Sequence, residues 1–203
     1  MSLDVALFRW LNGLAGHHPA LDGVMSAVAS YAPLVVVVVL LACWGRWRRS
    51  WQRAAGLATV AALVALGVGQ LLNVVLPRPR PFVVMPATVL VAHAPDPSFP
   101  SDHAILVFAV TVVLATVSRR LAAWLLVFSI LVLVARVYVG VHYPADVLGG
   151  AALGAAAGWA TVRLSRTAMI ERWIATLLDQ LARLHLASTA GSQGAGREGR
   201  ISR

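Results

Sequence analysis

Hydrophobic residues along this chain fall into long runs, and the short stretches between the runs collect arginine, histidine, aspartate and proline. A run of about 20 apolar residues can cross a bilayer as a helix, because a helix rises about 1.5 Å per residue and the hydrocarbon core is about 30 Å thick. The pattern therefore predicts an all-α fold, a polytopic transmembrane helix bundle of about five spans. Some spans must include flanking residues to reach the required length. The expected spans are roughly Met25–Trp44, Ala54–Leu76, Ala104–Val117, Leu121–Ala135 and Val147–Val162.

Amphipathic segments are expected on both sides of these spans. In residues 1–16 the apolar positions recur at helical spacing, without the basic start and long apolar core of a secretory signal. This predicts an interfacial helix, and the sequence leaves open whether it lies flat or crosses. A second amphipathic stripe predicts a cytoplasmic helix in residues 164–187, and the Gly- and Ser-rich residues 188–203 are expected to be disordered. Residues 1–163 would then form the membrane-embedded domain.

Composition supports the membrane assignment. The chain has 203 residues, of which 59% are hydrophobic, and its mean hydropathy of +0.77 is too high for an ordinary soluble domain. The net charge of +9 could suggest nucleic acid, but no basic domain with interleaved aromatic residues accompanies it. A single cysteine, Cys43, rules out an intrachain disulfide and a thiolate metal cluster. The expected partners are therefore lipids and not nucleic acid.

All 17 basic residues are arginine, and their distribution predicts the orientation. Connections rich in arginine face the cytoplasm according to the positive-inside rule. The cytoplasmic clusters would be Arg46 to Arg53, Arg119 with Arg120, and the seven arginines after Ala160. Arg78, Arg80 and Arg136 then lie on the extracytoplasmic side, together with the residues that could carry chemistry.

The stretch Ala135–Asp146 sets Arg136, His142 and Asp146 between two apolar runs. Asp146 follows His142 by four residues, a spacing that in a helical or turn-like backbone brings a carboxylate to one imidazole nitrogen and fixes the tautomer. The other nitrogen is then free to act. Arg136 offers a planar fork of donors that suits phosphate oxygens. The constellation predicts a histidine that faces a phosphoryl group.

Two arginines lie on the stretch Pro77–Phe82, in which prolines alternate with other residues. The prolines prevent a helix and hold the backbone extended, so Arg78 and Arg80 point to the same side. Arg80 could then bind a terminal phosphate. For Arg78 the sequence leaves two hypotheses open, a contact with an inner phosphate of the substrate or a contact with lipid headgroups.

Pro100 and Ser101 predict a helix start. Free backbone amides near Asp102 and His103, with the positive end of the helix dipole behind them, would form an anion site. Taken alone, Ser101 could be only a helix cap and His103 only an interfacial histidine. Their place on the same membrane face as His142 and the arginines favours a role in the site.

Two further patterns concern packing. Gly150, Gly154 and Gly158 recur every four residues in the last predicted span, which predicts close packing within the bundle, with a dimer interface as the alternative. The apolar residues Val83–Ala92 are too few to cross, and Pro86 interrupts them. They are expected to form either a re-entrant or interfacial segment beside the site or a loop packed over the bundle.

Three elements together resemble the three-part motif of the type-2 phosphatidic acid phosphatase superfamily, and most closely its bacterial undecaprenyl-diphosphatase branch. The elements are Arg80-Pro81, Pro100-Ser101-x-His103 and Arg136-x5-His142-x3-Asp146, and the likeness covers about Asn73–Gly150. The resemblance implies a metal-independent lipid phosphatase, without a cofactor, that works through a phosphohistidine intermediate.

The resemblance also implies roles for single residues. His142 would be the nucleophile, oriented by Asp146, and His103 would protonate the leaving oxygen and later deprotonate the attacking water. The phosphoryl oxygens would be held by side chains and nearby backbone amides. The candidate phosphate-binding residues are Arg80, Ser101, Asp102, Arg136 and, from its place beside Arg80, Arg78.

Three positions depart from the superfamily pattern. Asn73 stands where a lysine usually begins the first motif, and the chain contains no lysine to replace it. Ala135 stands where a serine usually precedes the arginine of the third motif. Asp102 stands where many members carry glycine, but this aspartate is usual in the undecaprenyl-diphosphatase branch.

The sequence therefore predicts an integral phosphatase of the bacterial plasma (inner) membrane that removes the terminal phosphate of undecaprenyl diphosphate on the extracytoplasmic face and recycles the carrier for cell-wall synthesis. The alternative substrates are phosphatidylglycerophosphate and phosphatidic acid, because the motifs contact phosphate and not the lipid.

Two other protein classes fit the sequence less well. A transporter would place charges deep in several spans, whereas here they gather at one end of the spans, and a catalytically dead scaffold would have lost a histidine or an arginine of the motifs. No metal is expected, since the histidines and the carboxylate already have roles among arginines that repel cations. The oligomeric state is left open.

Overall fold

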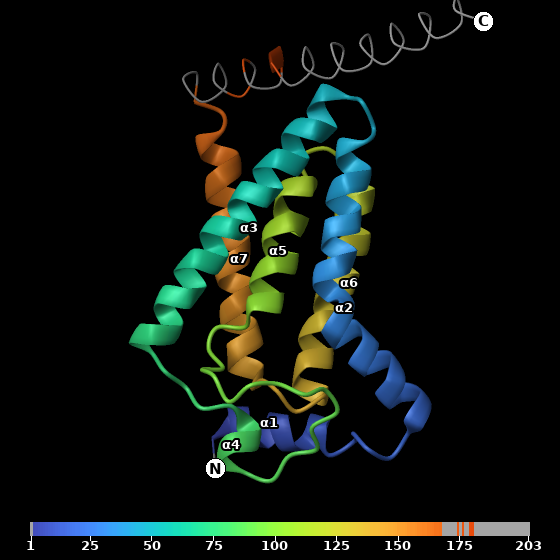
Figure 1. Cartoon of the computed structure of the whole chain (residues 1–203), viewed down its shortest axis with the longest axis vertical. Helices are drawn as coiled ribbons and strands as arrows, with labels where there is room; N and C mark the ends of the chain where they lie inside the picture. The colour runs from blue at the N-terminus through green and yellow to red at the C-terminus, as the bar shows by residue number, and fades with distance from the viewer. Residues whose placement is uncertain (1, 168–173, 175, 177–178, 181–203) are drawn as a thin grey trace, which may run out of the picture. The chain divides into compact units, whose positions relative to one another are not determined.

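The computed structural model describes residues 2–167, 174, 176, 179 and 180. Within these residues the chain contains helices and no strand, which confirms the all-α prediction (Figure 1). The helices are α1 (Leu3–Asn12), α2 (Pro19–Trp44), α3 (Arg49–Val75), α4 (Pro81–Val84), α5 (Asp102–Leu114), α6 (Arg119–Tyr138) and α7 (Pro144–Leu164).

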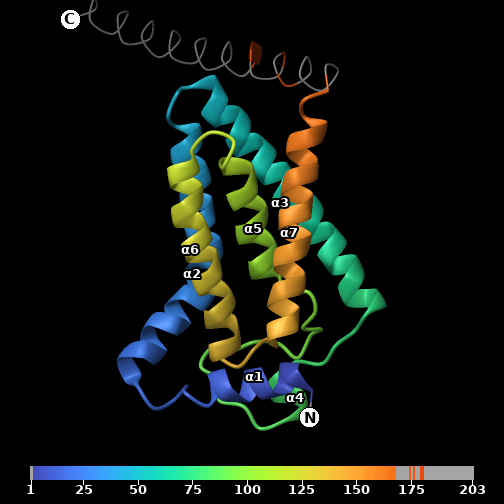
Figure 2. The same cartoon turned by 180° about the vertical axis from the view of Figure 1, so that it is seen from behind.

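Four helices, α2, α3, α6 and α7, are long and apolar enough to cross a membrane. The remaining predicted span, Ala104–Val117, corresponds to α5, which has only 13 residues. Figures 1 and 2 show α5 in the middle of the bundle with the longer helices around it. Because protein surrounds α5, the non-helical backbone that precedes it can lie at membrane depth without exposing polar groups to lipid. The prediction of a polytopic bundle is therefore confirmed, with four long helices and one shorter apolar helix.

The glycines of α7 pack against α5. A Cβ added at Gly154 would lie 2.2 Å from the carbonyl oxygen of Ile105, and one added at Gly150 would lie 2.5 Å from that of Ser101. No side chain fits at this separation, so the glycines allow the two helices to approach. The prediction of close packing within the bundle is confirmed. The approach also lets the Ser101 amide donate to the Asp146 carbonyl at 3.1 Å, which joins the second motif to the third.

A short turn joins α6 to α7 and carries His142. Gly140 begins this turn with a φ of +86°, and a Cβ there would lie 2.4 Å from the Thr88 carbonyl oxygen. Only glycine adopts this conformation without strain in so close a contact. Pro144 starts α7, where its missing amide hydrogen is not needed. The turn therefore has a defined course that presents His142 toward the bundle.

Helices α1 and α4 lie at the end of the bundle where α6 leads into α7 (Figures 1 and 2). α1 buries Phe8 and Asn12 and leaves the apolar residues Leu3, Leu7 and Trp10 exposed. The Asn12 side chain donates to the carbonyls of Tyr138 and Thr88, each at 2.8 Å. These bonds tie α1 to the end of α6.

The segment Val83–Ala92 contacts the end of the bundle at which α4 lies. It completes α4 and then continues without regular structure. The Leu90 amide donates to the Val139 carbonyl at 3.2 Å, so the segment packs over the end of α6.

Residues Met1–Val162 form one compact unit and residues Arg163–Arg203 form another. The expected cytoplasmic helix and disordered tail lie outside the described residues, apart from residues 164–167, 174, 176, 179 and 180.

Candidate active site

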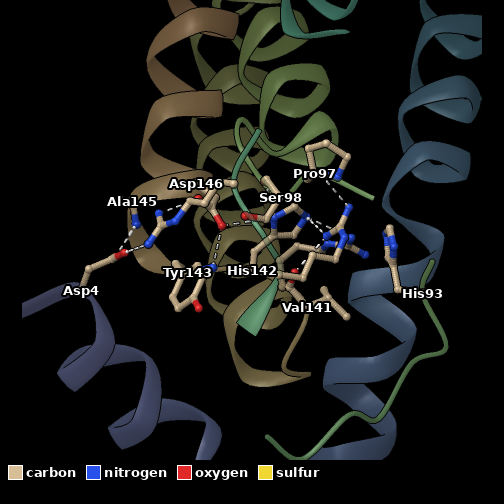
Figure 3. A network of polar contacts seen from close by, with 12 residues as sticks. Asp4, His93, Pro97, Ser98, Val141, His142, Tyr143, Ala145 and Asp146 are labelled. Carbon is tan, nitrogen blue, oxygen red and sulfur yellow. Dashed lines mark hydrogen bonds and ion pairs between the residues drawn. The ribbon is translucent and has the colours of Figure 1, made fainter. Parts of the chain in front are cut away.

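Three segments converge on His142. The turn after α6 carries His142 itself, the proline-rich stretch before α4 carries Arg80, and α6 carries Arg136 close to its end. All three side chains are buried. Figure 3 shows the imidazole in the centre of a polar network that extends to Asp146 and Tyr143. The structure therefore brings the first and third motifs of the sequence together.

The contacts of His142 determine its tautomer. Nε2 lies 3.2 Å from Nη1 of Arg80 and 3.2 Å from Nη2 of Arg136. Guanidinium groups only donate hydrogen bonds, so Nε2 must accept and carries no hydrogen. Nδ1 lies 2.9 Å from the Ser98 carbonyl oxygen, which can only accept, so Nδ1 carries the hydrogen. The lone pair of Nε2 thus faces two positive groups.

Burial and charge keep this imidazole neutral. Burial lowers the pKa of His142 to about 4, and the positive charges of Arg136 and Arg80 act in the same direction, against the carboxylate of Asp146, which raises it. At neutral pH the ring therefore carries no proton on Nε2. A nucleophile is available where phosphoryl oxygens would meet the guanidinium groups.

Asp146 lies beside the ring without bonding it directly. Its Oδ2 is 3.7 Å from Nδ1 of His142, and this oxygen accepts a hydrogen bond from the Tyr143 amide at 2.8 Å. The nearer partner of Nδ1 is the Ser98 carbonyl, a group that the sequence analysis did not name. A backbone carbonyl has the same chemistry in every residue, so no sequence signal could have identified it.

The two arginines are held in place by other groups. Arg80 donates to the Val141 carbonyl at 2.9 Å and to Oδ1 of Asp96 at 3.0 Å, and Arg136 donates to the Ala29 carbonyl at 3.3 Å. Nε of Arg136 is buried and has no partner. Buried donors are almost always satisfied, so this one is available for an oxygen of a bound phosphoryl group.

The start of α5 contributes further polar atoms. The hydroxyl groups of Ser98 and Ser101 are buried without partners, as is Oδ1 of Asp102, whose Oδ2 accepts from Gln70 at 3.0 Å. The Ser101 amide is occupied by the Asp146 carbonyl. Half-buried His103 lies within electrostatic range of His142 and the arginines. The second motif therefore adjoins the site, where the hydroxyl groups of Ser101 and of the preceding Ser98 are free to bind oxygen.

Two residues near His142 were missed by the sequence analysis. The His93 ring centroid is 6.3 Å from that of His142, and Nδ1 of His93 is 3.4 Å from Oδ1 of Asp96. Burial and the charge of Arg80 lower the pKa of His93. Burial by itself raises the pKa of Asp96, but the hydrogen bond from Arg80 holds that pKa below its ordinary value. The sequence signal that could have identified them is their spacing, a histidine followed three residues later by an aspartate between the first two motifs.

The structure does not place Arg78 beside Arg80 on His142. Its guanidinium binds the carboxylates of Asp4 and Asp146 and lies 4.0 Å from the centre of the Tyr143 ring. Asn73 occupies the position of the usual lysine, and its Nδ2 atom lies 3.5 Å from Oε1 of Gln70. The two guanidinium groups next to Nε2 of His142 therefore belong to Arg80 and Arg136.

No cluster of three or more histidine, cysteine, aspartate or glutamate side chains suited to a metal ion occurs in the described part of the chain. The positive charge around Nε2 comes from arginine.

Comparison with known proteins identifies the family and several relatives of this chain. Residues 53–170 match the sequence profile of the PAP2 superfamily. The chain is 31% identical to undecaprenyl-diphosphatase BcrC of Bacillus subtilis (strain 168) over 163 residues, which are 80% of this chain and 84% of that protein. It is also 31% identical to the putative undecaprenyl-diphosphatase YbjG of Escherichia coli (strain K12) over 155 residues, 75% of this chain and 78% of that protein.

Two crystal structures have the same fold. Aquifex aeolicus LpxE superposes with a TM-score of 0.71 and 25% identity, covering 80% of this chain and 96% of that one. The PAP2 type phosphatidylglycerolphosphate phosphatase of Bacillus subtilis superposes with a TM-score of 0.65 and 23% identity, covering 81% of this chain and 85% of that one.

Proposed function

Because the chain belongs to the PAP2 superfamily, we propose that it removes the terminal phosphate of undecaprenyl diphosphate through a phosphohistidine intermediate. The observation that carries this proposal is the unprotonated Nε2 of His142, which lies 3.2 Å from each of two guanidinium groups. The relatives named undecaprenyl-diphosphatase support the choice of substrate.

In the first step, Nε2 of His142 attacks the terminal phosphorus. The new N–P bond forms as the bond from phosphorus to the bridging oxygen breaks. Arg80 and Arg136 stabilise the charge on the phosphoryl oxygens, with the free hydroxyl groups of Ser98 and Ser101 as further donors. His103 gives a proton to the leaving oxygen, and undecaprenyl phosphate departs.

In the second step, water replaces the histidine. His103 takes a proton from the water, whose oxygen attacks phosphorus while the N–P bond breaks, and inorganic phosphate leaves. Between the two steps the ring of His142 is a cation, because Nδ1 keeps its hydrogen while Nε2 carries the phosphoryl group. The carboxylate of Asp146, 3.7 Å from Nδ1, stabilises that cation.

The mechanism uses no metal. The phosphoryl oxygens meet two arginine side chains at His142, and their positive charge both serves the reaction and repels a divalent cation. Activity should therefore survive a chelator. Loss of activity in EDTA that magnesium or zinc restores would contradict this part of the proposal.

The proposed orientation places the site on the extracytoplasmic side of the bacterial plasma membrane. The arginines of the connection between α2 and α3, and of that between α5 and α6, support it through the positive-inside rule. Released undecaprenyl phosphate would then be available for another round of cell-wall synthesis.

The test is phosphate release by the purified full-length protein from undecaprenyl diphosphate, phosphatidylglycerophosphate and phosphatidic acid, with His142→Ala as the inactive control. We expect the highest kcat/KM with undecaprenyl diphosphate. We also expect acid-labile phosphate trapped on the wild type and none on His142→Ala. A preference for either phospholipid would reject the proposed substrate, and equal label on the variant would reject the nucleophile.

A further inference from the structure

Arg78 bridges two carboxylates that lie far apart in the sequence. Its Nη1 donates to Oδ1 of Asp146 at 2.7 Å, and its Nη2 donates to Oδ2 of Asp4 in the first turn of α1. The Arg78 guanidinium also lies 4.0 Å from the centre of the Tyr143 ring, and Figure 3 shows Asp4, Tyr143 and Asp146 of this network. Both terminal nitrogens of Arg78 are therefore bound to carboxylates of the protein itself.

Burial makes this bridge important for Asp146. The side chain of Asp146 is fully buried, with 0% of its surface exposed, while those of Arg78 and Asp4 are 31% and 20% exposed. A buried carboxylate is strongly disfavoured unless a positive group or several hydrogen bonds compensate it. Arg78 is the positive group that contacts Asp146.

A second connection runs from Arg78 to His142 through the backbone. The Arg78 carbonyl accepts a hydrogen bond from the Ser98 amide at 2.8 Å, and the Ser98 carbonyl accepts from Nδ1 of His142 at 2.9 Å. The Asp146 carboxylate is thus bound by the Arg78 side chain, and the residue that carries the Ser98 carbonyl is bound through its amide to the Arg78 backbone.

Asp4 holds this arrangement from the side of α1. Its second oxygen accepts a hydrogen bond at 2.8 Å from the amide of Ala145, which lies in the first turn of α7 immediately before Asp146. One carboxylate therefore fixes both the Arg78 side chain and the start of the helix that carries Asp146. Asp4 lies outside residues 53–170, the part that matches the superfamily profile.

We propose that Asp4 is a positioning residue for His142, acting through Arg78 and Asp146, so that helix α1 is a working part of the active site. The inference rests on the proposed phosphohistidine mechanism. Asp4 keeps the Arg78 guanidinium directed at Asp146. Asp146 and the Ser98 carbonyl then hold the His142 ring while it becomes a cation. Arg78 is in this view a bridge and not a ligand of the inner phosphate.

The experiment uses the full-length protein and compares Asp4→Asn, Asp4→Glu, Arg78→Gln and the double variant Asp4→Asn/Arg78→Gln. Asn keeps an oxygen for the Ala145 amide and loses only the charge that holds Arg78. The matched control is Asp22→Asn, because Asp22 also ties the N-terminal region to α6, through Tyr138 at 2.6 Å, but has no link to His142. Thermal unfolding of each variant shows that the protein is folded.

A displacement of reacting groups by 1 Å can slow a reaction about 100-fold, so the partial loss of support in Asp4→Asn is expected to lower kcat about 10-fold. KM should stay within about twofold, because no substrate contact is removed. Asp4→Glu should recover part of the rate, and Asp22→Asn should stay within about twofold of the wild type. Adding Asp4→Asn to Arg78→Gln should change kcat by less than about twofold, since Asp4 acts through Arg78.

Several results would overturn the inference. These are a wild-type kcat in Asp4→Asn, an equal loss in Asp22→Asn, or independent effects of Asp4→Asn and Arg78→Gln. A larger loss in Arg78→Gln with a diphosphate than with a monophosphate substrate would instead make Arg78 a substrate ligand. Wild-type protein that releases no phosphate would overturn the proposed function and this inference together, whereas an active wild type with an equally active Asp4→Asn would overturn the inference alone.

Discussion

At the scale of single residues, the charge state of His142 decides whether the site can act. The ring is buried beside two guanidinium groups, and a proton on Nε2 would add a third positive charge to the cluster. In the proposed mechanism, the groups that bind the phosphate therefore also keep Nε2 of His142 unprotonated. Binding and activation have one electrostatic cause.

This charge state predicts a pH dependence. The pKa of His142 is lowered from its ordinary 6.5 to about 4, so the active neutral form persists as pH falls and is lost only near pH 4. We expect the rate of phosphoenzyme formation to fall at acidic pH with a midpoint close to pH 4. A rapid quench with labelled substrate across this range measures it, and a midpoint near pH 6.5 would contradict the buried, neutral imidazole.

The lowered pKa of His142 also determines how the stability of the folded protein changes with pH. The unfolded chain binds a proton at His142 below about pH 6.5, whereas the folded protein does so only below about pH 4. The contribution of this group to the free energy of unfolding is therefore complete above pH 6.5 and decreases as pH falls toward 4. Replacing His142 with Gln should flatten this part of the pH dependence of the thermal midpoint.

The contributions of Asp146 and of the Ser98 carbonyl to the state of the His142 ring can be separated by mutation. In a catalytic triad, loss of the aspartate charge costs about 10⁴-fold because the histidine takes the wrong tautomer. Here the Ser98 carbonyl, at 2.9 Å, holds the tautomer by itself. Asp146→Asn should therefore lower kcat by only about 10- to 100-fold, through weaker stabilisation of the cationic ring. A loss of about 10⁴-fold in folded protein would show that Asp146 controls the tautomer after all.

At the scale of helices, the separation of α5 and α7 sets the distance between the second and third motifs. The contact between the Ser101 amide and the Asp146 carbonyl at 3.1 Å depends on the close approach at Gly150 and Gly154. A wider separation would move Ser101 away from His142. Helix packing and active-site geometry are therefore coupled.

The coupling predicts the effect of a single methyl group. Gly154→Ala would place Cβ 2.2 Å from the Ile105 carbonyl oxygen, and a backbone atom cannot move aside as a side chain can. We expect a loss of about 1–3 kcal/mol in stability, together with reduced activity. Gly67→Ala in α3 is the matched control, because a Cβ there has no neighbour within 4 Å.

Thermal unfolding in detergent and phosphate release provide both measurements. The control is expected to keep wild-type activity and to be no less stable than the wild type, since alanine favours helix more than glycine does. Equal stability of Gly154→Ala and Gly67→Ala would mean that α5 and α7 can separate freely.

At the scale of the whole molecule, the arginine distribution predicts which end faces the cytoplasm. Ala94, beside the site, and Arg48, between α2 and α3, are both exposed. After replacement of Cys43, we expect Ala94→Cys to react with an impermeant maleimide in intact cells. Arg48→Cys should react only after permeabilisation. The reverse pattern would place the site in the cytoplasm.

The sequence by itself determined the helical class, the apolar runs and the three polar stretches, because hydropathy and motif spacing are local properties of the chain. The five apolar segments that correspond to α2, α3, α5, α6 and α7 followed from run length alone. The length of α5 did not, because how far a buried helix must reach depends on the protein around it.

Only the tertiary structure decided which groups meet at His142. The sequence placed Arg78 with Arg80 on one side of an extended segment, but the carboxylate of Asp4, 74 residues away, binds the Arg78 fork together with Asp146. The sequence could not identify the Ser98 carbonyl as the partner of Nδ1 of His142, since every residue has the same backbone carbonyl. Contacts between distant segments are set by packing, and packing brought α1, the proline-rich stretch and the start of α7 to one histidine.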